Sequence, residues 1–147
     1  MSIEDDVALL ERVPTLRLLG TEPLRMLAIG SEQREIVRGD KLFSQGDDAD
    51  CGYVVQGGAF RVDDGSGAET IARTGMLMGE LALIVAMKRP STATALEYSS
   101  VIRISRSLFQ RVLESDPAAA ARLRSEFISR TSQLASDILI AGTKLST

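Results

Sequence analysis

Glycines divide residues 33–105 into short segments, and this spacing limits the fold more than any other feature of the sequence. The segments suited to extended structure cover residues 35–38, 41–44, 53–56, 59–63, 69–73, 92–97 and 101–105. Each is shorter than a typical helix, and glycine at the breaks allows the tight turns that join strands. Many short strands at near-regular spacing are typical of closed antiparallel folds. The sequence therefore predicts an antiparallel β jelly-roll barrel over residues 31–105.

Two helices are expected before this barrel. Residues 3–12 space their apolar residues as a helix does, and Pro14 should end that helix. Thr21 can cap the second helix, with Pro23 in its first turn and an apolar face made of Leu24, Leu27 and Ala28. These helices make up the N-terminal part of the domain, residues 1–30.

Two more helices are expected after the barrel, in residues 106–142. Ser107 can cap the first, and Asp116 followed by Pro117 predicts the start of the second, which Gly142 should end. The second helix carries an apolar stripe formed by Leu123, Phe127, Leu134, Ile138 and Ala141. This stripe either packs on the domain's own barrel or forms a lid over a ligand, a homodimer seam, or both.

The whole chain of 147 residues fits a single α+β domain. Its net charge of −3 argues against a nucleic-acid surface, and it has no run of 18 apolar residues that would predict a transmembrane helix. The acidic residues 4–6 are unlike a signal peptide, and the lone Cys51 suits a reducing compartment. We therefore expect a cytoplasmic protein with neither nucleic-acid nor membrane partners.

The absence of histidine excludes most catalytic arrangements. It removes Ser-His-Asp and Cys-His catalysis and most zinc sites. The chain also lacks a Gly-x-Ser-x-Gly elbow and a Gly-x-x-x-x-Gly-Lys phosphate loop, and Asp47, Asp48 and Asp50 do not have calcium-loop spacing. We expect no catalytic residues, no metal site and no cofactor, in a protein that is not an enzyme.

One segment combines three groups suited to a small phosphorylated ligand. Gly79 and Glu80 open a short helix predicted over residues 80–86, and Arg89 follows nine positions after the glutamate. Amide groups at a helix start bind anions, and an arginine fork donates two directed hydrogen bonds to a phosphate. The carboxylate would accept a hydrogen bond from a sugar hydroxyl. Together these groups predict a nucleotide site.

The order of these residues resembles the phosphate-binding cassette of the cyclic-nucleotide-binding domain family. The family pattern reads Phe-Gly-Glu-Leu-Ala-Leu, then variable residues, then Pro-Arg and small residues. Residues 78–83 and 89–93 of this chain are similar to the two ends of that pattern. We therefore place the cassette at residues 79–93. Residues 13–16 also look like the family's N-terminal segment. The family includes regulatory subunits of cAMP-dependent protein kinase, cyclic-nucleotide-gated channels and the catabolite activator protein.

The resemblance implies a role for each site residue. Glu80 would accept from a ribose 2′-hydroxyl, and Arg89 would pair with the cyclic phosphate of cAMP or cGMP, between which the sequence does not choose. The other ligand-binding residues implied are Gly79, Leu81, Ala82, Ser91 and Thr92. Arg122 and Arg124 either stack on the base or belong to a solvated helix face.

Pro90 departs from the family pattern, which has a small residue directly after the arginine. Proline has no N–H, so one phosphate donor is missing unless a shift presents Ser91 instead. Whether binding is weakened or abolished stays open. We expect a non-enzymatic cyclic-nucleotide sensor whose last helix is a lid or dimer switch. The alternative is a degenerate domain of the same fold that serves protein interaction or dimerisation.

Overall fold

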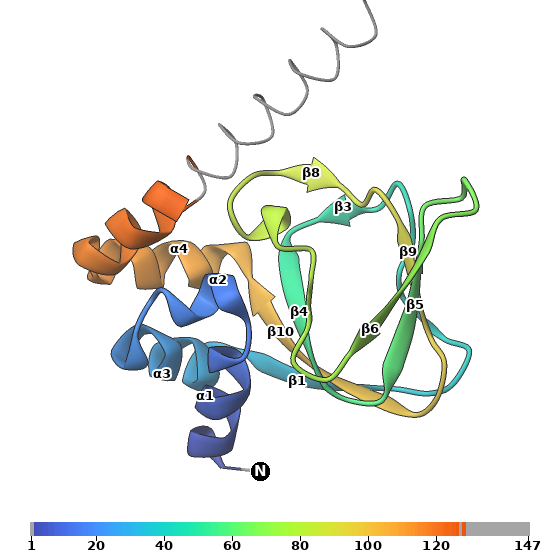
Figure 1. Ribbon diagram of the computed structural model, residues 1–147, viewed down its shortest axis with the longest axis horizontal. Coiled ribbons are helices and arrows are strands. Elements are labelled where there is room, and N and C mark those ends of the chain that lie inside the picture. The colour runs from blue at the N-terminus through green and yellow to red at the C-terminus, as the bar shows by residue number, and fades with distance from the viewer. Residues whose placement is uncertain (1, 127, 129–147) are drawn as a thin grey trace, which may run out of the picture.

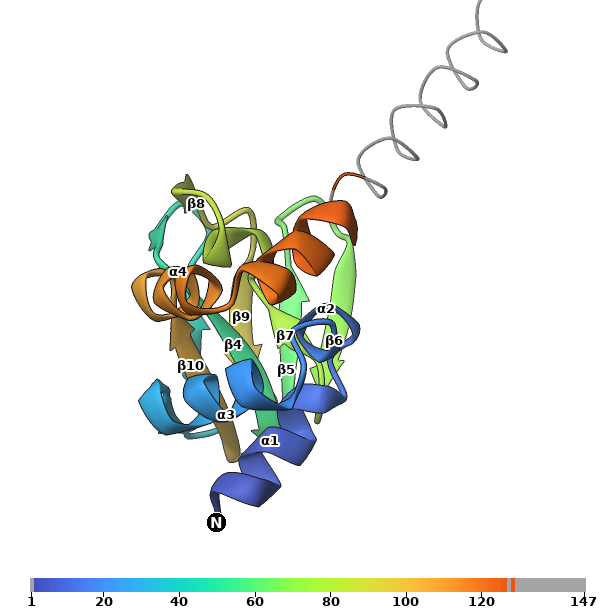
Figure 2. The same ribbon diagram turned by 90° about the vertical axis from the view of Figure 1, so that its left-hand side faces the viewer.

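The computed structural model describes residues 2–126 and 128, in which helices lie beside two facing four-stranded antiparallel sheets and a third sheet of two strands (Figure 1). The N-terminal helices are α1 (Ile3–Glu11), α2 (Pro14–Arg17) and α3 (Thr21–Gly30), and α4 (Arg106–Ser115) follows the strands. A further helix, the last described, covers residues 117–126. The helices gather on one side of the sheets, as both views show (Figure 2).

The strands of the described residues form three antiparallel sheets. The first sheet has the order β1 (Glu32–Ile36), β10 (Ser99–Ser105), β4 (Cys51–Gly57) and β7 (Leu77–Met78). The second has the order β2 (Lys41–Phe43), β9 (Thr92–Ala95), β5 (Ala59–Asp63) and β6 (Glu69–Arg73). The third pairs β3 (Asp48–Ala49) with β8 (Met87–Lys88).

Strand β4 contributes to two apolar cores. Tyr53 and Val55 belong to the core between the two larger sheets, and Val54 belongs to the core beneath the helices. Successive side chains of a strand point to opposite faces, so one strand serves both cores. The first sheet is therefore covered by helices on one face and by the second sheet on the other.

The predicted combination of antiparallel strands with flanking helices is confirmed, whereas the sheets do not close into a barrel. Gly39 and Gly58, with φ of 89° and 83°, turn the chain from one large sheet to the other, so successive strands β1–β2 and β4–β5 do not pair. The finer jelly-roll assignment stays a prediction. Strands β5 and β6 have the predicted bounds. Strands β3, β7 and β8 were not predicted, because each has only two residues, too few to show an alternation of apolar and polar side chains.

Three helix boundaries differ from the prediction. Thr21 is the first residue of α3, and the capping position is Gly20, whose φ of 88° turns the chain into the helix. Ser105, the last residue of β10, caps α4 in place of the predicted Ser107. Its hydroxyl accepts a hydrogen bond from the amide of Leu108, in the first turn of the helix, at 3.1 Å. Pro14 follows α1 but also begins α2, a third N-terminal helix that was not predicted, since the fixed φ of proline suits a first helical position.

The predicted start of the last helix is confirmed. The Asp116 carboxylate accepts the hydrogen bond of the Ala119 amide at 3.1 Å. Leu123, the first residue of the predicted stripe, is buried in the core beneath the helices. The remaining residues of that stripe and the predicted stop, Phe127, Leu134, Ile138, Ala141 and Gly142, lie outside the described residues.

The cassette helix is shorter than the predicted range of 80–86. It is a single 3-10 turn, Leu81–Leu83, labelled η1. Met87 and Lys88 then pair with Ala49 and Asp48 as strand β8. This pairing draws the chain into an extended conformation before an α-helix can propagate.

Replacing Gly58 by alanine should lower the free energy of unfolding more than the same change at Gly67. Both have positive φ, 83° and 96°, where alanine costs about 1–2 kcal/mol. A Cβ at Gly58 would also lie 2.7 Å from the Ser99 Cα, whereas one at Gly67 meets nothing within 4 Å beyond its chain neighbours. This overpacking should add roughly 1–3 kcal/mol. Urea unfolding measures both losses, and equal values would contradict the clash.

Candidate functional site

A cavity of about 420 Å³ lies between the cassette and the second sheet. The sheet wall includes Phe43, Val62, Thr70 and Ala72, and the opposite wall is formed by residues 76–82, 87 and 89–91. The volume and the mostly apolar lining with a few polar groups are typical of small-molecule sites. Gly79, Glu80 and Arg89, predicted to act together, line this one cavity.

Gly79 brings two backbone segments close together between β7 and η1. Its φ of 80° lies in the left-handed region that favours glycine. A Cβ here would lie 2.4 Å from Nη1 of Arg89 and 3.2 Å from the carbonyl oxygen of Cys51. Glycine therefore allows the Arg89 guanidinium to lie against the turn. The Ala82 amide, one of the predicted anion donors, donates instead to the Gly79 carbonyl oxygen at 3.2 Å.

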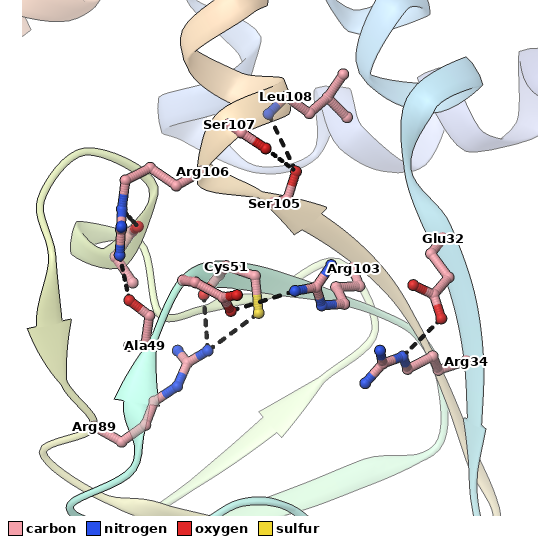
Figure 3. Close-up of polar contacts among 12 residues, drawn as sticks. Glu32, Arg34, Ala49, Cys51, Arg89, Arg103, Ser105, Arg106, Ser107 and Leu108 are labelled. Atoms are coloured by element: carbon pink, nitrogen blue, oxygen red, sulfur yellow. Dashed lines mark hydrogen bonds and ion pairs between the residues drawn. The ribbon is translucent and has the colours of Figure 1, made fainter.

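Arg89 is 4% exposed, which is unusual for a charged side chain. Its Nη2 donates to the Cys51 carbonyl oxygen at 2.9 Å and to the Cys51 sulfur at 3.2 Å (Figure 3). Its Cζ lies 4.4 Å from the centroid of the Phe43 ring and 5.5 Å from that of Tyr53. The Arg89 amide donates to the Asp47 carbonyl oxygen at 2.7 Å, which holds the backbone in place.

Among the described residues, no acidic side chain forms an ion pair with Arg89. The Cys51 carbonyl dipole and the ring faces of Phe43 and Tyr53 offset part of the free-energy cost of burying the guanidinium charge. Within the same residues, Nε and Nη1 of Arg89 make no hydrogen bond to protein. A tyrosine phenol is neutral at neutral pH, and burial raises the pKa of Tyr53 further, so this side chain adds no negative charge beside Arg89. Nε and Nη1 of the guanidinium are therefore available to donate to an anion.

Glu80 lines the same cavity from the cassette side. Its Oε1 accepts a hydrogen bond from the Thr15 hydroxyl at 2.6 Å. Thr15 is 3% exposed and lies in α2, 65 positions earlier in the chain. The sequence singled out residues 13–16 for their similarity to the family's N-terminal segment but did not connect Thr15 to the site, because no local spacing indicates so distant a contact.

A family model described as the cyclic nucleotide-binding domain matches residues 33–116, which include the whole cassette. The chain belongs to the cyclic nucleotide-binding domain family. The family predicted from the cassette residues is thereby confirmed.

A curated relative of this cyclic nucleotide-binding domain is the cAMP-dependent protein kinase type II regulatory subunit of Drosophila melanogaster. The two are 28% identical over 125 residues, which are 84% of this chain and 33% of that protein. The chain thus spans about a third of the length of this relative.

Solved structures agree with the fold. A cyclic nucleotide-binding-like protein from Brucella abortus bv. 1 str. 9-941 is 36% identical, with a TM-score of 0.67 over 75% of this chain and 98% of its own. The N-terminal domain of a transcriptional regulator from Streptomyces coelicolor A3(2) is 27% identical, with a TM-score of 0.80 over 88% of this chain and 94% of its own.

The remaining predicted site residues of this domain divide between two faces of the chain. Leu81 and Ser91 line the cavity, and so does Pro90. Thr92 belongs to β9 and does not line the cavity. Its hydroxyl instead accepts a hydrogen bond from the Gln45 amide at 2.9 Å. Neighbouring residues of an extended chain face opposite ways, which separates Ser91 from Thr92.

The two arginines considered for base contacts do not line the cavity. Arg122 donates from Nε to the Leu18 carbonyl oxygen at 2.8 Å and from Nη2 to the Leu19 carbonyl oxygen at 3.0 Å. Arg124 lines a separate hollow beside η1 and α4. Arg122 therefore ties the last described helix to the segment between α2 and α3.

Two further findings concern the described part of the chain. None of its helices is long and apolar enough to cross a membrane. It also holds no group of three or more His, Cys, Asp or Glu side chains placed to bind a metal ion.

Replacing Gly79 by alanine should destabilise the domain by about 2–4 kcal/mol, because a strained φ adds to a clash with Arg89. The loss should be smaller when Arg89 is already alanine, since the atom closest to the new Cβ is then absent. A double-mutant cycle of unfolding free energies measures this coupling. Zero coupling would show that Gly79 serves the turn without making room for the guanidinium.

Proposed function

We propose that this domain binds a cyclic nucleotide, cAMP or cGMP, and acts as a non-enzymatic sensor module. The observation that carries this proposal is the buried Arg89 guanidinium, which lines a cavity without an acidic partner among the described residues. A buried charge is costly unless it is paired. The phosphate of a bound nucleotide would supply the missing negative charge.

Each part of a cyclic nucleotide has a suitable counterpart in the cavity. Nε and Nη1 of Arg89 are the donors for the phosphate, since Nη2 is engaged by Cys51. Glu80 accepts from the ribose 2′-hydroxyl. The apolar remainder of the cavity, with Val62 and Ala72 on the sheet wall, suits a purine base. Similarity to a cAMP-dependent kinase regulatory subunit supports the same ligand class.

A second candidate function is an interaction or dimerisation module that has lost the ligand. Pro90 favours it, because this residue lines the cavity directly after Arg89 and has no N–H for a phosphate. Against it stands the retained guanidinium, which an interaction module would not need to bury without an acidic partner. We therefore place nucleotide binding first, with an affinity reduced by the missing donor.

We further propose that the last helix responds to the ligand and mediates a weak homodimer. Arg122 links this helix to Leu18 and Leu19, which directly follow α2, and Thr15 links α2 to Glu80. A ligand that orders Glu80 therefore acts on elements that already contact the last helix. The sensor would be cytoplasmic and would act on an effector domain or a partner protein.

Replacing Arg89 by alanine should weaken cyclic-nucleotide binding at least about tenfold, because hydrogen bonds to a charged group are worth roughly 1.5–3 kcal/mol. Calorimetry with cAMP and cGMP measures the affinities. Arg111→Ala, which removes an exposed arginine of α4, is the matched control and should keep the wild-type affinity.

Two outcomes would contradict the proposal in different ways. Equal affinity of Arg89→Ala and wild type would place the ligand elsewhere. A wild-type protein that binds neither nucleotide would favour the interaction module. Circular dichroism of each variant checks that the fold is retained.

Saturating cyclic nucleotide should slow amide exchange across residues 118–126. The expected cause is that an ordered Glu80 stabilises α2 through Thr15, and the residues directly after α2 stabilise the last described helix through Arg122. Mass spectrometry of deuterium uptake, with and without ligand, measures the effect. The central strand β10, paired on both sides, is the internal control. Unchanged uptake across residues 118–126 would indicate a pocket without a switch.

A further inference from the structure

Thr15 is one of three buried polar or charged side chains in the described residues, and it forms a hydrogen bond with a residue of the candidate site. The other two are Arg89 and Ser99. The Thr15 hydroxyl donates to Oε1 of Glu80 at 2.6 Å, a short hydrogen bond to a carboxylate. A buried hydroxyl requires a partner, and here the carboxylate of Glu80, a residue that lines the cavity, is such a partner.

The position of Thr15 is set by the core on either side of it. Val13 and Leu16 are 3% and 0% exposed, and both pack in the core beneath the helices. Pro14 begins the single turn of α2, in which the Arg17 amide donates to the Val13 carbonyl oxygen at 2.9 Å. The β-branched Thr15 side chain itself has few rotamers. The hydroxyl is thus presented at a defined place.

Thr15 contacts Glu80 from outside the ligand cavity. It does not line the 420 Å³ cavity but lines an adjacent hollow of about 390 Å³, together with Arg12 and Gly75. Glu80 lines both. Thr15 therefore acts on a ligand through the carboxylate and not by direct contact.

We propose that Thr15 is a positioning residue that orients the Glu80 carboxylate toward the 2′-hydroxyl of a bound ribose cyclic nucleotide. A carboxylate offers about four acceptor sites, so it can accept hydrogen bonds from the Thr15 hydroxyl and from a ribose hydroxyl at the same time. Glutamate has several rotatable bonds, and holding it in one orientation before binding reduces the ordering required when ligand arrives. This inference rests on the proposed function.

The test compares Thr15→Val with wild type for two ligands. The ligands are whichever of cAMP or cGMP binds wild type more tightly, and its 2′-deoxy analogue. Calorimetry should show that Thr15→Val weakens the ribose nucleotide about threefold to tenfold, the range of one modest hydrogen-bond contribution. The 2′-deoxy analogue should change by less than about twofold.

Three further variants separate positioning from stability. Thr15→Ser keeps the hydroxyl and should restore discrimination between the two ligands. Thr15→Val in a Glu80→Ala background should have no further effect, because the group that it positions is absent. Thr21→Val, the same change in the neighbouring helix α3, should leave both affinities unchanged. If Thr15→Val does not fold by circular dichroism, Thr15→Ala replaces it.

The possible failures are distinguishable. An equal loss for both ligands would show that Thr15 acts on stability alone, and no loss for either would show that Glu80 needs no orientation; each overturns the inference but leaves nucleotide binding intact. A wild-type protein that binds no cyclic nucleotide would overturn the proposed function and this inference with it.

Discussion

The burial of the Arg89 guanidinium without an acidic partner among the described residues is the constraint on which the rest of the site depends. The protein accommodates it with a carbonyl oxygen from Cys51 and the ring faces of Phe43 and Tyr53. Gly79 leaves the space that the guanidinium fills. The resulting positive charge beside an apolar cavity is what makes an anionic ligand with an apolar part the best physical match.

The cassette is held from several directions, although it contains little regular structure. Strand β8 pairs with β3 on one side of it, and Arg106 donates to the carbonyl oxygens of Ala82, at 2.9 Å, and Ala49. Thr15 contacts Glu80 from α2. Because the residues directly after α2, Leu18 and Leu19, accept the hydrogen bonds of Arg122, the cavity and the last described helix both contact the stretch of chain from α2 to Leu19.

Pro90 is compatible with the backbone geometry around it. The amide of Arg89 donates to the Asp47 carbonyl oxygen at 2.7 Å, and the Arg89 carbonyl accepts the Gly46 amide at 2.8 Å. These two bonds hold Arg89 as a strand-like residue, which is the conformation that a following proline favours. The departure from the family pattern therefore removes a donor without disturbing the direction in which the arginine enters the core.

Local patterns in the sequence determined the bounds of β5 and β6, the cap at Asp116 and the grouping of Gly79, Glu80 and Arg89, since each depends on neighbouring residues. The tertiary structure decided the features that depend on distant contacts. It separated the sheets, shortened the cassette helix, turned Thr92 away from the cavity and brought Thr15 to Glu80 across 65 positions. Periodicity and caps act within a few residues, whereas packing depends on segments that the sequence alone does not bring together.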